Sequence, residues 1–303
     1  MNNRIFGIGL ASIDFLGVVD HIPRPDSVVE MGQFSIQGGG NAATALVTAA
    51  HLGLETRFCG KISDDMFGTF ILDGLTNMGI DTSGVVVEPG RVSPFTFVGV
   101  EATDGHRVLY HTRGNCSPLV PDEIDLTSIE WASCLLVDGY QIKAQVTAAR
   151  QAAAAGIPVV LDASHIQEKG MGELLSDANI LIATERFAAE VAPMGEVEDS
   201  LHELTRMGPH TVVVTLGEEG SIGLDATGIV RVRALPIDST DTTGAGDVYR
   251  GAFLYAHLQG WPLGRCMEFA SAAAGLSCQT LGGRAGIPNL EQITETLAAH
   301  KTS

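Results

Sequence analysis

The chain has 303 residues, of which 45% are hydrophobic and 18% are charged, a composition that allows a large buried core in an ordinary globular protein. Asp and Glu number 36 against 18 Lys and Arg, and the resulting net charge of −18 argues against binding to nucleic acid or to an anionic membrane surface. Any phosphate ligand must therefore be held by local features of the chain and by a metal ion.

The five cysteines are scattered without CxxC spacing, and their odd number argues against a disulfide framework. We interpret them as small buried apolar residues in a reducing compartment. Residues 1–10 are too short and too glycine-broken for a signal peptide, and no run of about 18 apolar residues occurs. We expect a cytoplasmic protein without a membrane segment.

Residues 4–10 form the first apolar run, which predicts a buried strand. Asp14 lies in the loop expected after it, at the edge where open α/β sheets bind ligands, and is a candidate contact for substrate hydroxyls. From this segment alone, a turn or cap aspartate is an equally good interpretation. Residues 15–36 contain Pro23 and Pro25 and are expected to be irregular.

The glycine-rich stretch at 37–40 comes directly before a helix-forming run that ends at Gly53. Such a loop can cradle phosphate, but the Lys-Ser or Lys-Thr pair of a P-loop is missing, so we reject a P-loop here.

The segment 92–112 alternates between apolar and polar residues and has a turn signal at Asp104-Gly105, which predicts a β-hairpin. A hairpin between α/β units suggests a lid. Arg113 follows it; a surface arginine and a contact to substrate or product phosphate are both open interpretations.

The second half of the chain alternates between expected strands and helices. Strands are predicted at 134–137, 157–162 and 211–216, and helices at 143–155 and 262–281. Asp138 follows the first of these strands, again at a carboxyl end where ligands gather. The rhythm predicts a mostly parallel sheet in one α/β domain.

The most informative stretch is Asp241-Thr-Thr-Gly-Ala-Gly-Asp247, followed by a helix-compatible run. Gly244, Ala245 and Gly246 permit a tight turn whose N–H groups converge at a helix N-terminus and form an anion hole. Asp247 would lie beside the bound phosphoryl group, where a carboxylate can take a proton from an attacking hydroxyl. The alternative is an aspartate that only caps the helix.

The residues 241–247 resemble the C-terminal signature of the ribokinase/PfkB family of sugar and nucleoside kinases. Gly39, Gly40 and Asn41 resemble its N-terminal signature in the form seen in ketohexokinase-like members, and Gly282 to Pro288 resembles sulfofructose-kinase-like members. The resemblance implies an α/β fold of the ribokinase type, a three-layer sandwich with a mostly parallel central sheet and a small β lid. It implies one kinase domain over 1–303, with lid segments at about 15–37 and 90–112.

The resemblance also implies roles for individual residues. Asp247 would be the catalytic base, and Gly244, Ala245 and Gly246 would form the anion hole. The sugar would be bound by Asp14, Gly39, Gly40, Asn41 and Asp138, with Arg113 as a further candidate. Thr215, Gly217, Gly220 and Ser271 would line the ATP groove, and Asp241, Thr243, Ser277 and Gly282 would enclose a monovalent cation.

Some positions depart from the family pattern. Thr44 stands where both branches have Asn, and Thr184 and Phe187 replace the Asn and Glu of an Asn-x-x-Glu motif that organises magnesium and water. Glu185 is a candidate substitute. These departures leave the identity of the sugar open.

We therefore expect an ATP-dependent kinase that phosphorylates a hydroxymethyl group of a sugar or sugar-like small molecule, with Mg²⁺ bridging the β- and γ-phosphates and K⁺ as a candidate activator. In some members of the family the lid also pairs between subunits, so a homodimer through the lid is a further candidate. The alternatives are a nucleoside kinase on the same fold and a non-catalytic sugar-binding relative.

Overall fold

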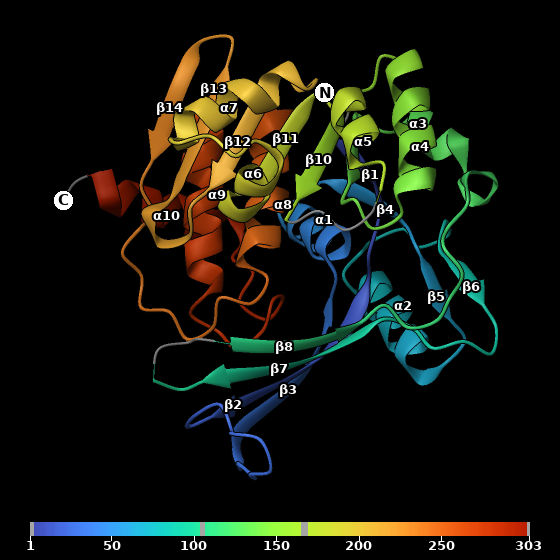
Figure 1. The fold of residues 1–303 in the computed structure, drawn as a ribbon, viewed down its shortest axis with the longest axis vertical. Helices are drawn as coiled ribbons and strands as arrows, with labels where there is room; N and C mark the ends of the chain where they lie inside the picture. The colour runs from blue at the N-terminus through green and yellow to red at the C-terminus, as the bar shows by residue number, and fades with distance from the viewer. Residues whose placement is uncertain (1–2, 104–106, 165–168, 302–303) are drawn as a thin grey trace.

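The computed structural model describes residues 3–103, 107–164 and 169–301. Its largest element is an eight-stranded sheet with strand order β14-β13-β12-β11-β10-β9-β1-β4 (Figure 1). The strands from β4 to β12 are parallel, and β13 and β14 continue the sheet antiparallel. The strands are β1 (Arg4–Ile8), β4 (Glu55–Cys59), β9 (Cys134–Val137), β10 (Val159–Ala163), β11 (Ile180–Thr184), β12 (Thr211–Thr215), β13 (Ser221–Asp225) and β14 (Gly228–Val232).

Helices cover both faces of this sheet, which makes a three-layer sandwich (Figure 1). One face packs against α1 (Asn41–His51), α8 (Ala245–Leu258), α9 (Leu263–Ser277) and α10 (Leu290–Lys301). The other packs against α3 (Leu126–Trp131), α4 (Ile142–Ala154), α5 (Met171–Asp177), α6 (Glu185–Val191) and α7 (Val197–Arg206).

The central strands read as continuous apolar runs because both of their faces are buried. In β9, Cys134 and Leu136 belong to one core cluster, and Leu135 and Val137 belong to the other. This follows from the two-residue period of a strand, which points successive side chains to opposite faces. The mostly parallel three-layer sandwich predicted from the sequence is confirmed.

A second sheet has four strands in the order β3-β2-β7-β8 and extends away from the sandwich (Figure 1). It contains β2 (Ser12–Val19), β3 (Met31–Gly39), β7 (Phe95–Glu101) and β8 (Arg107–Thr112). The antiparallel pair β7 and β8 confirms the hairpin predicted at 92–112, while its expected turn, Asp104-Gly105, lies outside the described residues. The sequence interpretation of 15–36 as irregular was wrong at both ends, because β2 and β3 occupy them and only the segment with the prolines lies between strands.

A small unit beside the second sheet contains β5 (Lys61–Ser63), β6 (Val86–Glu88) and α2 (Met66–Asn77). Helix α2 begins after Asp65, whose carboxylate caps it by accepting from the N–H of Gly68 at 2.8 Å. Phe67 of α2 lies against Phe15 of β2 and Phe95 of β7, at ring-centroid distances of 5.7 and 5.2 Å. The second sheet therefore packs on a helix.

The order of strands reverses between β1 and β9. From β1 the chain goes outward to β4 on one side, and from β9 it goes outward through β10, β11 and β12 on the other. In open α/β sheets, ligands bind at the carboxyl ends of the strands where the order reverses. The loops after β1 and β9 therefore mark the place to look for a site.

Candidate active site

A cavity of about 330 Å³ lies at this reversal point, beneath the second sheet. Its walls come from both ends of the chain: the loop after β1, strands β2, β7 and β8, the start of α1, and the turn before α8. It brings together seven of the residues singled out in the sequence: Asp14, Gly39, Gly40, Asn41, Thr243, Gly244 and Asp247. Four of the proposed sugar contacts, Asp14, Gly39, Gly40 and Asn41, therefore face the same cavity as the proposed base.

The pairing register of the second sheet decides which of its side chains face the cavity. Asp14 of β2 is paired with Thr96 of β7, and Thr96 is paired with His111 of β8. All three line the cavity, and the hydroxyl of Thr96 lies 3.2 Å from Nδ1 of His111. Asp14 is thus a strand residue and not the loop residue that we expected.

The surroundings of Asp14 favour a role as a hydrogen-bond acceptor. Its Oδ1 accepts from the hydroxyl of Ser12 at 3.0 Å. Burial raises the pKa of Asp14, and its hydrogen bonds and the charge of Arg284 oppose that rise. A β-carbon on Gly39 would lie 2.1 Å from Oδ2 of Asp14, so only glycine at that position leaves the carboxylate in place.

The glycine turn before α1 brings the backbone close to the loop after β1. Gly40 has φ of 92°, and a β-carbon there would lie 2.4 Å from the carbonyl oxygen of Leu10. Asn41 is the first residue of α1, and its amide nitrogen donates to the hydroxyl of Ser164 at 3.2 Å. The turn therefore puts Asn41 at the cavity wall.

The turn at Gly244 starts α8. Gly244 has φ of 73°, and a β-carbon there would lie 2.6 Å from Cα of Gly283, so the turn packs directly on the loop after α9. The N–H of Ala245 donates to the carbonyl of Thr242 at 3.3 Å. The N–H groups of Gly246 and Asp247 follow in the first helical turn, where no intrahelical acceptor exists. They are the better candidates for an anion hole.

Asp247 projects from that first turn, and its side chain is 18% exposed. Burial raises the pKa of Asp247 to about 7, with the positive charge of Arg250 as the largest opposing influence. A carboxylate with a pKa near the working pH is suited to general base catalysis.

Two arginines at the cavity were not singled out from the sequence. Arg107 of β8 lines it and donates from Nη1 to the hydroxyl of Thr242 in the turn before α8. Arg284 donates from Nη2 to the carbonyl of Gly39 at 2.7 Å and from Nε to the hydroxyl of Thr44 at 3.2 Å. Burial lowers the pKa of Arg284 to about 10, so it stays charged at neutral pH. In the sequence, the feature that could have pointed to these two arginines is the small number of Lys and Arg residues in an acidic chain.

Asp138 does not line the cavity. Its side chain is buried, and both carboxylate oxygens accept hydrogen bonds. Oδ2 accepts from the N–H groups of Leu10 at 2.7 Å and Ala42 at 3.3 Å, and Oδ1 accepts from the N–H of Tyr140 at 3.0 Å and from Nε2 of Gln145 at 2.9 Å. Four donors occupy the lone pairs of both oxygens, so the carboxylate has no capacity left for a substrate hydroxyl. The expected sugar contact is thus a structural link between the loops after β1 and β9 and the start of α1.

Three of the residues expected along the ATP groove, Thr215, Gly217 and Gly220, lie at the same carboxyl edge, further along the sheet. Thr215 ends β12 and is paired with Thr184 at the end of β11. Gly217 and Gly220 form the turn between β12 and β13, with φ of 60° and 102°. Ser271 lies within α9 and is 8% exposed. None of these expected residues is part of the cavity lining.

The residues expected around a monovalent cation are partly connected. Oδ1 of Asp241 accepts from the N–H and hydroxyl of Thr243 at 2.9 and 2.7 Å, and Oδ2 accepts from the N–H of Gly282 at 2.8 Å. The hydroxyl of Ser277 donates to the carbonyl of Ala274 at 2.8 Å within α9. Asp241 thus joins the turn before α8 to the loop after α9, with one lone-pair direction on Oδ2 to spare.

The Asn-x-x-Glu position has a structural use in this chain. The hydroxyl of Thr184 caps α6 by accepting from the N–H of Phe187 at 3.2 Å, and Glu185 is exposed. Within the described ranges, no group of three or more His, Cys, Asp or Glu side chains forms a metal site.

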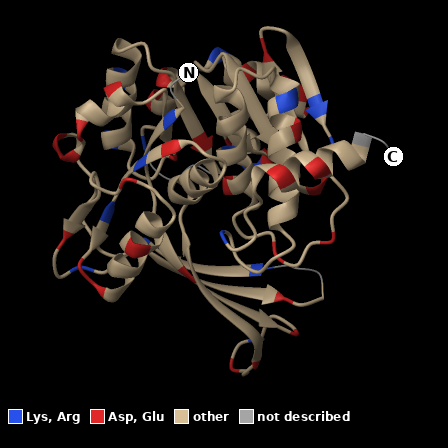
Figure 2. Ribbon diagram, turned by 180° about the vertical axis from the view of Figure 1, so that it is seen from behind, with Lys and Arg blue, Asp and Glu red and all other residues tan. Residues whose placement is uncertain are grey.

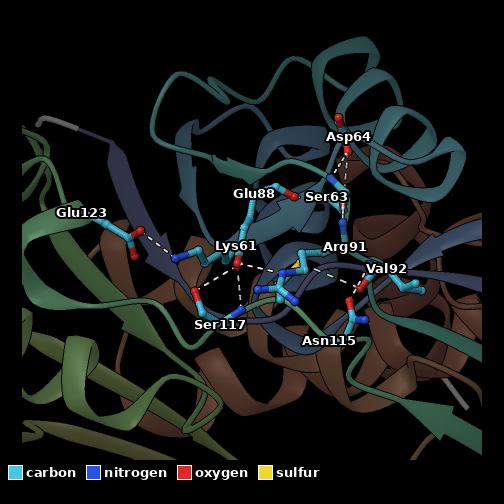
Figure 3. Close-up of polar contacts among 11 residues, drawn as sticks. Lys61, Ser63, Asp64, Glu88, Arg91, Val92, Asn115, Ser117 and Glu123 are labelled. Carbon is cyan, nitrogen blue, oxygen red and sulfur yellow. Dashed lines mark hydrogen bonds and ion pairs between the residues drawn. The ribbon is translucent and has the colours of Figure 1, made fainter.

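A smaller cavity of about 90 Å³ shares Leu10 and Tyr140 with the larger one and is lined by Lys61 and Arg113. The guanidinium of Arg113 lies over the ring of Tyr140, 4.8 Å from its centroid. Lys61 donates to Glu123 at 2.6 Å (Figure 3).

Polar contacts join the segment after β8 to β6 and to the loop that follows β6 (Figure 3). The hydroxyl of Ser117 donates to Glu88 at 2.9 Å, and the N–H of Val92 donates to Asn115 at 2.7 Å. Lys61 and Ser117, which line the smaller cavity, therefore already have partners.

Charged residues lie on helices, strands and loops throughout the described part of the chain (Figure 2). In the part of the chain that the structure describes, no helix has both the length and the apolar composition needed to cross a membrane.

Comparison with known proteins shows the family and the fold of the chain. Residues 2–290 match the family model described as pfkB family carbohydrate kinase. The chain is 28% identical to a 5-dehydro-2-deoxygluconokinase of Geobacillus kaustophilus, covering 97% of this chain and 93% of that protein. It is 25% identical to a nucleoside kinase of Methanothermobacter thermautotrophicus, covering 97% and 96%. The structure of Arabidopsis thaliana ribokinase complexed with ribose and ATP superposes with a TM-score of 0.83 at 24% identity, covering 98% and 99%.

Proposed function

The chain belongs to the pfkB family of carbohydrate kinases and is an ATP-dependent sugar kinase, and we propose that Asp247 is the general base when the γ-phosphoryl group of ATP is transferred to the sugar. The observation that supports this proposal is that Asp247, the turn at Gly244 and the proposed sugar contact Asp14 line one cavity. A sugar hydroxymethyl group placed there faces the first turn of α8, which provides both the base and the N–H groups of the turn.

The reaction then proceeds in a single displacement. The hydroxyl oxygen forms a bond to the γ-phosphorus while the bond from that phosphorus to the β–γ bridging oxygen breaks and ADP leaves. The hydroxyl proton passes to Asp247, and the N–H groups of Gly246 and Asp247 bind the equatorial phosphoryl oxygens. Mg²⁺ would arrive with the nucleotide and neutralise charge that an acidic chain cannot.

The contacts of the four-stranded sheet support its role as a lid over the cavity. Asp14, Thr96 and His111 face the cavity from it, and Arg107 reaches from it to Thr242. In the closed form, the sheet keeps water away from the phosphoryl group. We place the ATP groove along Thr215, Gly217, Gly220 and Ser271, at the carboxyl edge beside the turn before α8.

The outward face of the same sheet supports a homodimer. Phe34, Phe97 and Tyr110 are 58%, 51% and 70% exposed, and their registers put them on one face. Large exposed apolar side chains on one face are typical of an interface between subunits. Light scattering coupled to gel filtration measures the oligomeric state, and a monomer at micromolar concentration would contradict the dimer.

The cavity is near the lower end of the range of about 300–1,000 Å³ for small-molecule pockets, which favours a monosaccharide over a nucleoside as acceptor. Arg113 is a substrate contact in this proposal if the sugar carries an anionic group that extends into the smaller cavity. A panel of ketoses, aldoses, sugar acids, sulfosugars and nucleosides, assayed for ADP release, separates these acceptor classes and the non-catalytic alternative.

The decisive variant is Asp247→Asn. It keeps the size and polarity of the side chain but cannot accept the proton, so turnover should fall by about 10² or more while ATP still binds. Near-wild-type turnover would refute the assignment of the base.

A further inference from the structure

Arg250 lies one helical turn after Asp247 on α8 and is 1% exposed, the bulkiest of the fully buried side chains. Burial of a guanidinium is unfavourable unless an opposite charge and hydrogen bonds compensate it. Arg250 contacts Asp162 near the carboxyl end of β10, so it faces that edge of the central sheet. Packing alone therefore does not explain why a charged side chain is buried at this position.

The compensating charge is Asp162, at the carboxyl end of β10, whose side chain is fully buried. Nε of Arg250 contacts Oδ1 of Asp162 in an ion pair. Within the described part of the chain, neither oxygen of Asp162 accepts a geometrically good hydrogen bond, so the charge of the guanidinium is what stabilises it. Nη2 of Arg250 donates to the hydroxyl of Ser164 at 3.4 Å, and the same hydroxyl accepts from Asn41.

The other side of the guanidinium faces the base. Nη1 of Arg250 lies 3.9 Å from Oδ1 of Asp247. A β-carbon on Gly246 would lie 2.5 Å from Nη1, so glycine at this position makes room for the guanidinium under the anion-hole turn. The cation is thus shared between two carboxylates, one at the site and one behind it.

We propose that Arg250 and Asp162 form a buried positioning pair for the catalytic base: Arg250 holds the carboxylate of Asp247 in its deprotonated form, and Asp162 limits the positive charge that Arg250 presents. This inference rests on the proposed role of Asp247 as general base. A purely structural ion pair would link α8 to β10 without controlling the ionisation of Asp247.

The pKa of Asp247 reflects burial and the charges of groups around it. Arg250 and Arg284 favour the deprotonated carboxylate, while Asp14 and Asp138 oppose it, as does burial. Burial raises the pKa of Asp162, and the positive charge of Arg250 opposes that rise. Of the two cations, Arg250 is the stronger influence on the pKa of Asp247.

Two substitutions should shift the pKa of Asp247 in opposite directions, and the acidic limb of the pH profile, where activity falls as this carboxylate is protonated, should shift with it. Arg250→Gln removes the cation, so the acidic limb of kcat/KM for the sugar should move to higher pH by about 1 unit or more, since an opposite charge within about 4–6 Å shifts a carboxyl pKa by 1–3 units. Asp162→Asn removes the competing carboxylate, so the limb should move to lower pH by about half a unit or more. Arg250→Lys keeps the charge and should leave the limb between those of the wild type and Arg250→Gln.

The controls separate this inference from the proposed function. Arg231→Gln breaks an exposed ion pair with Glu198 and should leave the limb unchanged. If Asp247→Asn keeps its turnover, the proposed function fails. If Asp247→Asn is inactive but Arg250→Gln and Asp162→Asn lower kcat without moving the limb, only the positioning role fails and the pair is structural.

The near-isosteric Asp162→Asn keeps the test decisive if Arg250→Gln is recovered unfolded by circular dichroism. A downward shift of its limb supports the positioning role, and an unshifted or upward-shifted limb overturns it. If both of these variants are unfolded, Arg250→Lys decides, because its single ammonium group cannot reproduce the contacts of the guanidinium with both carboxylates. A limb displaced to higher pH supports the positioning role, and a limb that coincides with that of the wild type overturns it.

Discussion

Gly39 should control the affinity for sugar through Asp14, although it presents no side chain of its own. In Gly39→Ala, the new β-carbon would lie 2.1 Å from Oδ2 and 2.5 Å from Cγ of Asp14. Contacts below 3.0 Å are not tolerated, so the carboxylate must rotate away from the cavity. We expect Gly39→Ala to mimic the loss of Asp14 without changing any polar group.

The size of the effect follows from the hydrogen bonds lost. Each hydrogen bond to a charged group contributes about 1.5–3 kcal/mol, and 1.4 kcal/mol is a factor of ten in affinity. One lost bond should therefore raise the Kd for sugar roughly 10- to 100-fold, while the Kd for ATP stays within about twofold. Calorimetric titration of both ligands measures this in Gly39→Ala and Asp14→Ala.

Gly32→Ala is the matched control, because Gly32 lies in the same strand and a β-carbon there meets nothing within 4 Å. It should bind sugar as the wild type does. In the double variant, Gly39→Ala should add little to Asp14→Ala, since both remove one interaction. Wild-type sugar affinity in Gly39→Ala, or additive effects in the double variant, would refute the reasoning.

Four further predictions concern pH, the lid, the cation and the turn after β12. Because the base must be deprotonated and the pKa of Asp247 is raised to about 7, kcat/KM for the sugar should fall about tenfold per unit below pH 7 and level off above it; a flat profile from pH 5 to 8 would contradict this. Arg107→Gln should lower kcat roughly 10- to 100-fold by removing a donor near the transferring group, as steady-state kinetics would show, and an unchanged kcat would remove Arg107 from the site. If Asp241 and the loop after α9 hold a monovalent cation, K⁺ should raise turnover above that in Na⁺ or a bulky organic cation at matched ionic strength, and equal rates would remove the site. Gly220→Ala should destabilise the fold by about 1–3 kcal/mol or more in urea unfolding, because φ is 102° and the β-carbon would lie 2.1 Å from the carbonyl of Val232; Gly228→Ala, with φ of 115° and no atom within 4 Å, should cost less.

The chain itself determined the features that depend on neighbouring residues. The stretch 241–247 specifies a glycine turn, a helix start and a projecting carboxylate within seven residues, so its geometry follows from local sterics. The continuous apolar strands and the rhythm of strand and helix likewise predicted the parallel sheet, because each element carries its own periodicity. The hairpin at 92–112 was predictable for the same reason.

Only the tertiary structure decided how polar groups from distant segments share their partners. Asp138 was a reasonable sugar contact until Leu10, Ala42 and Gln145 were found to occupy its oxygens. Arg250 and Asp162 are far apart in the sequence, and nothing local to either predicts a shared buried charge. A carboxylate at the end of a strand has the same sequence signature whether protein donors or a substrate bind it, because the choice depends on which long-range contacts the fold completes.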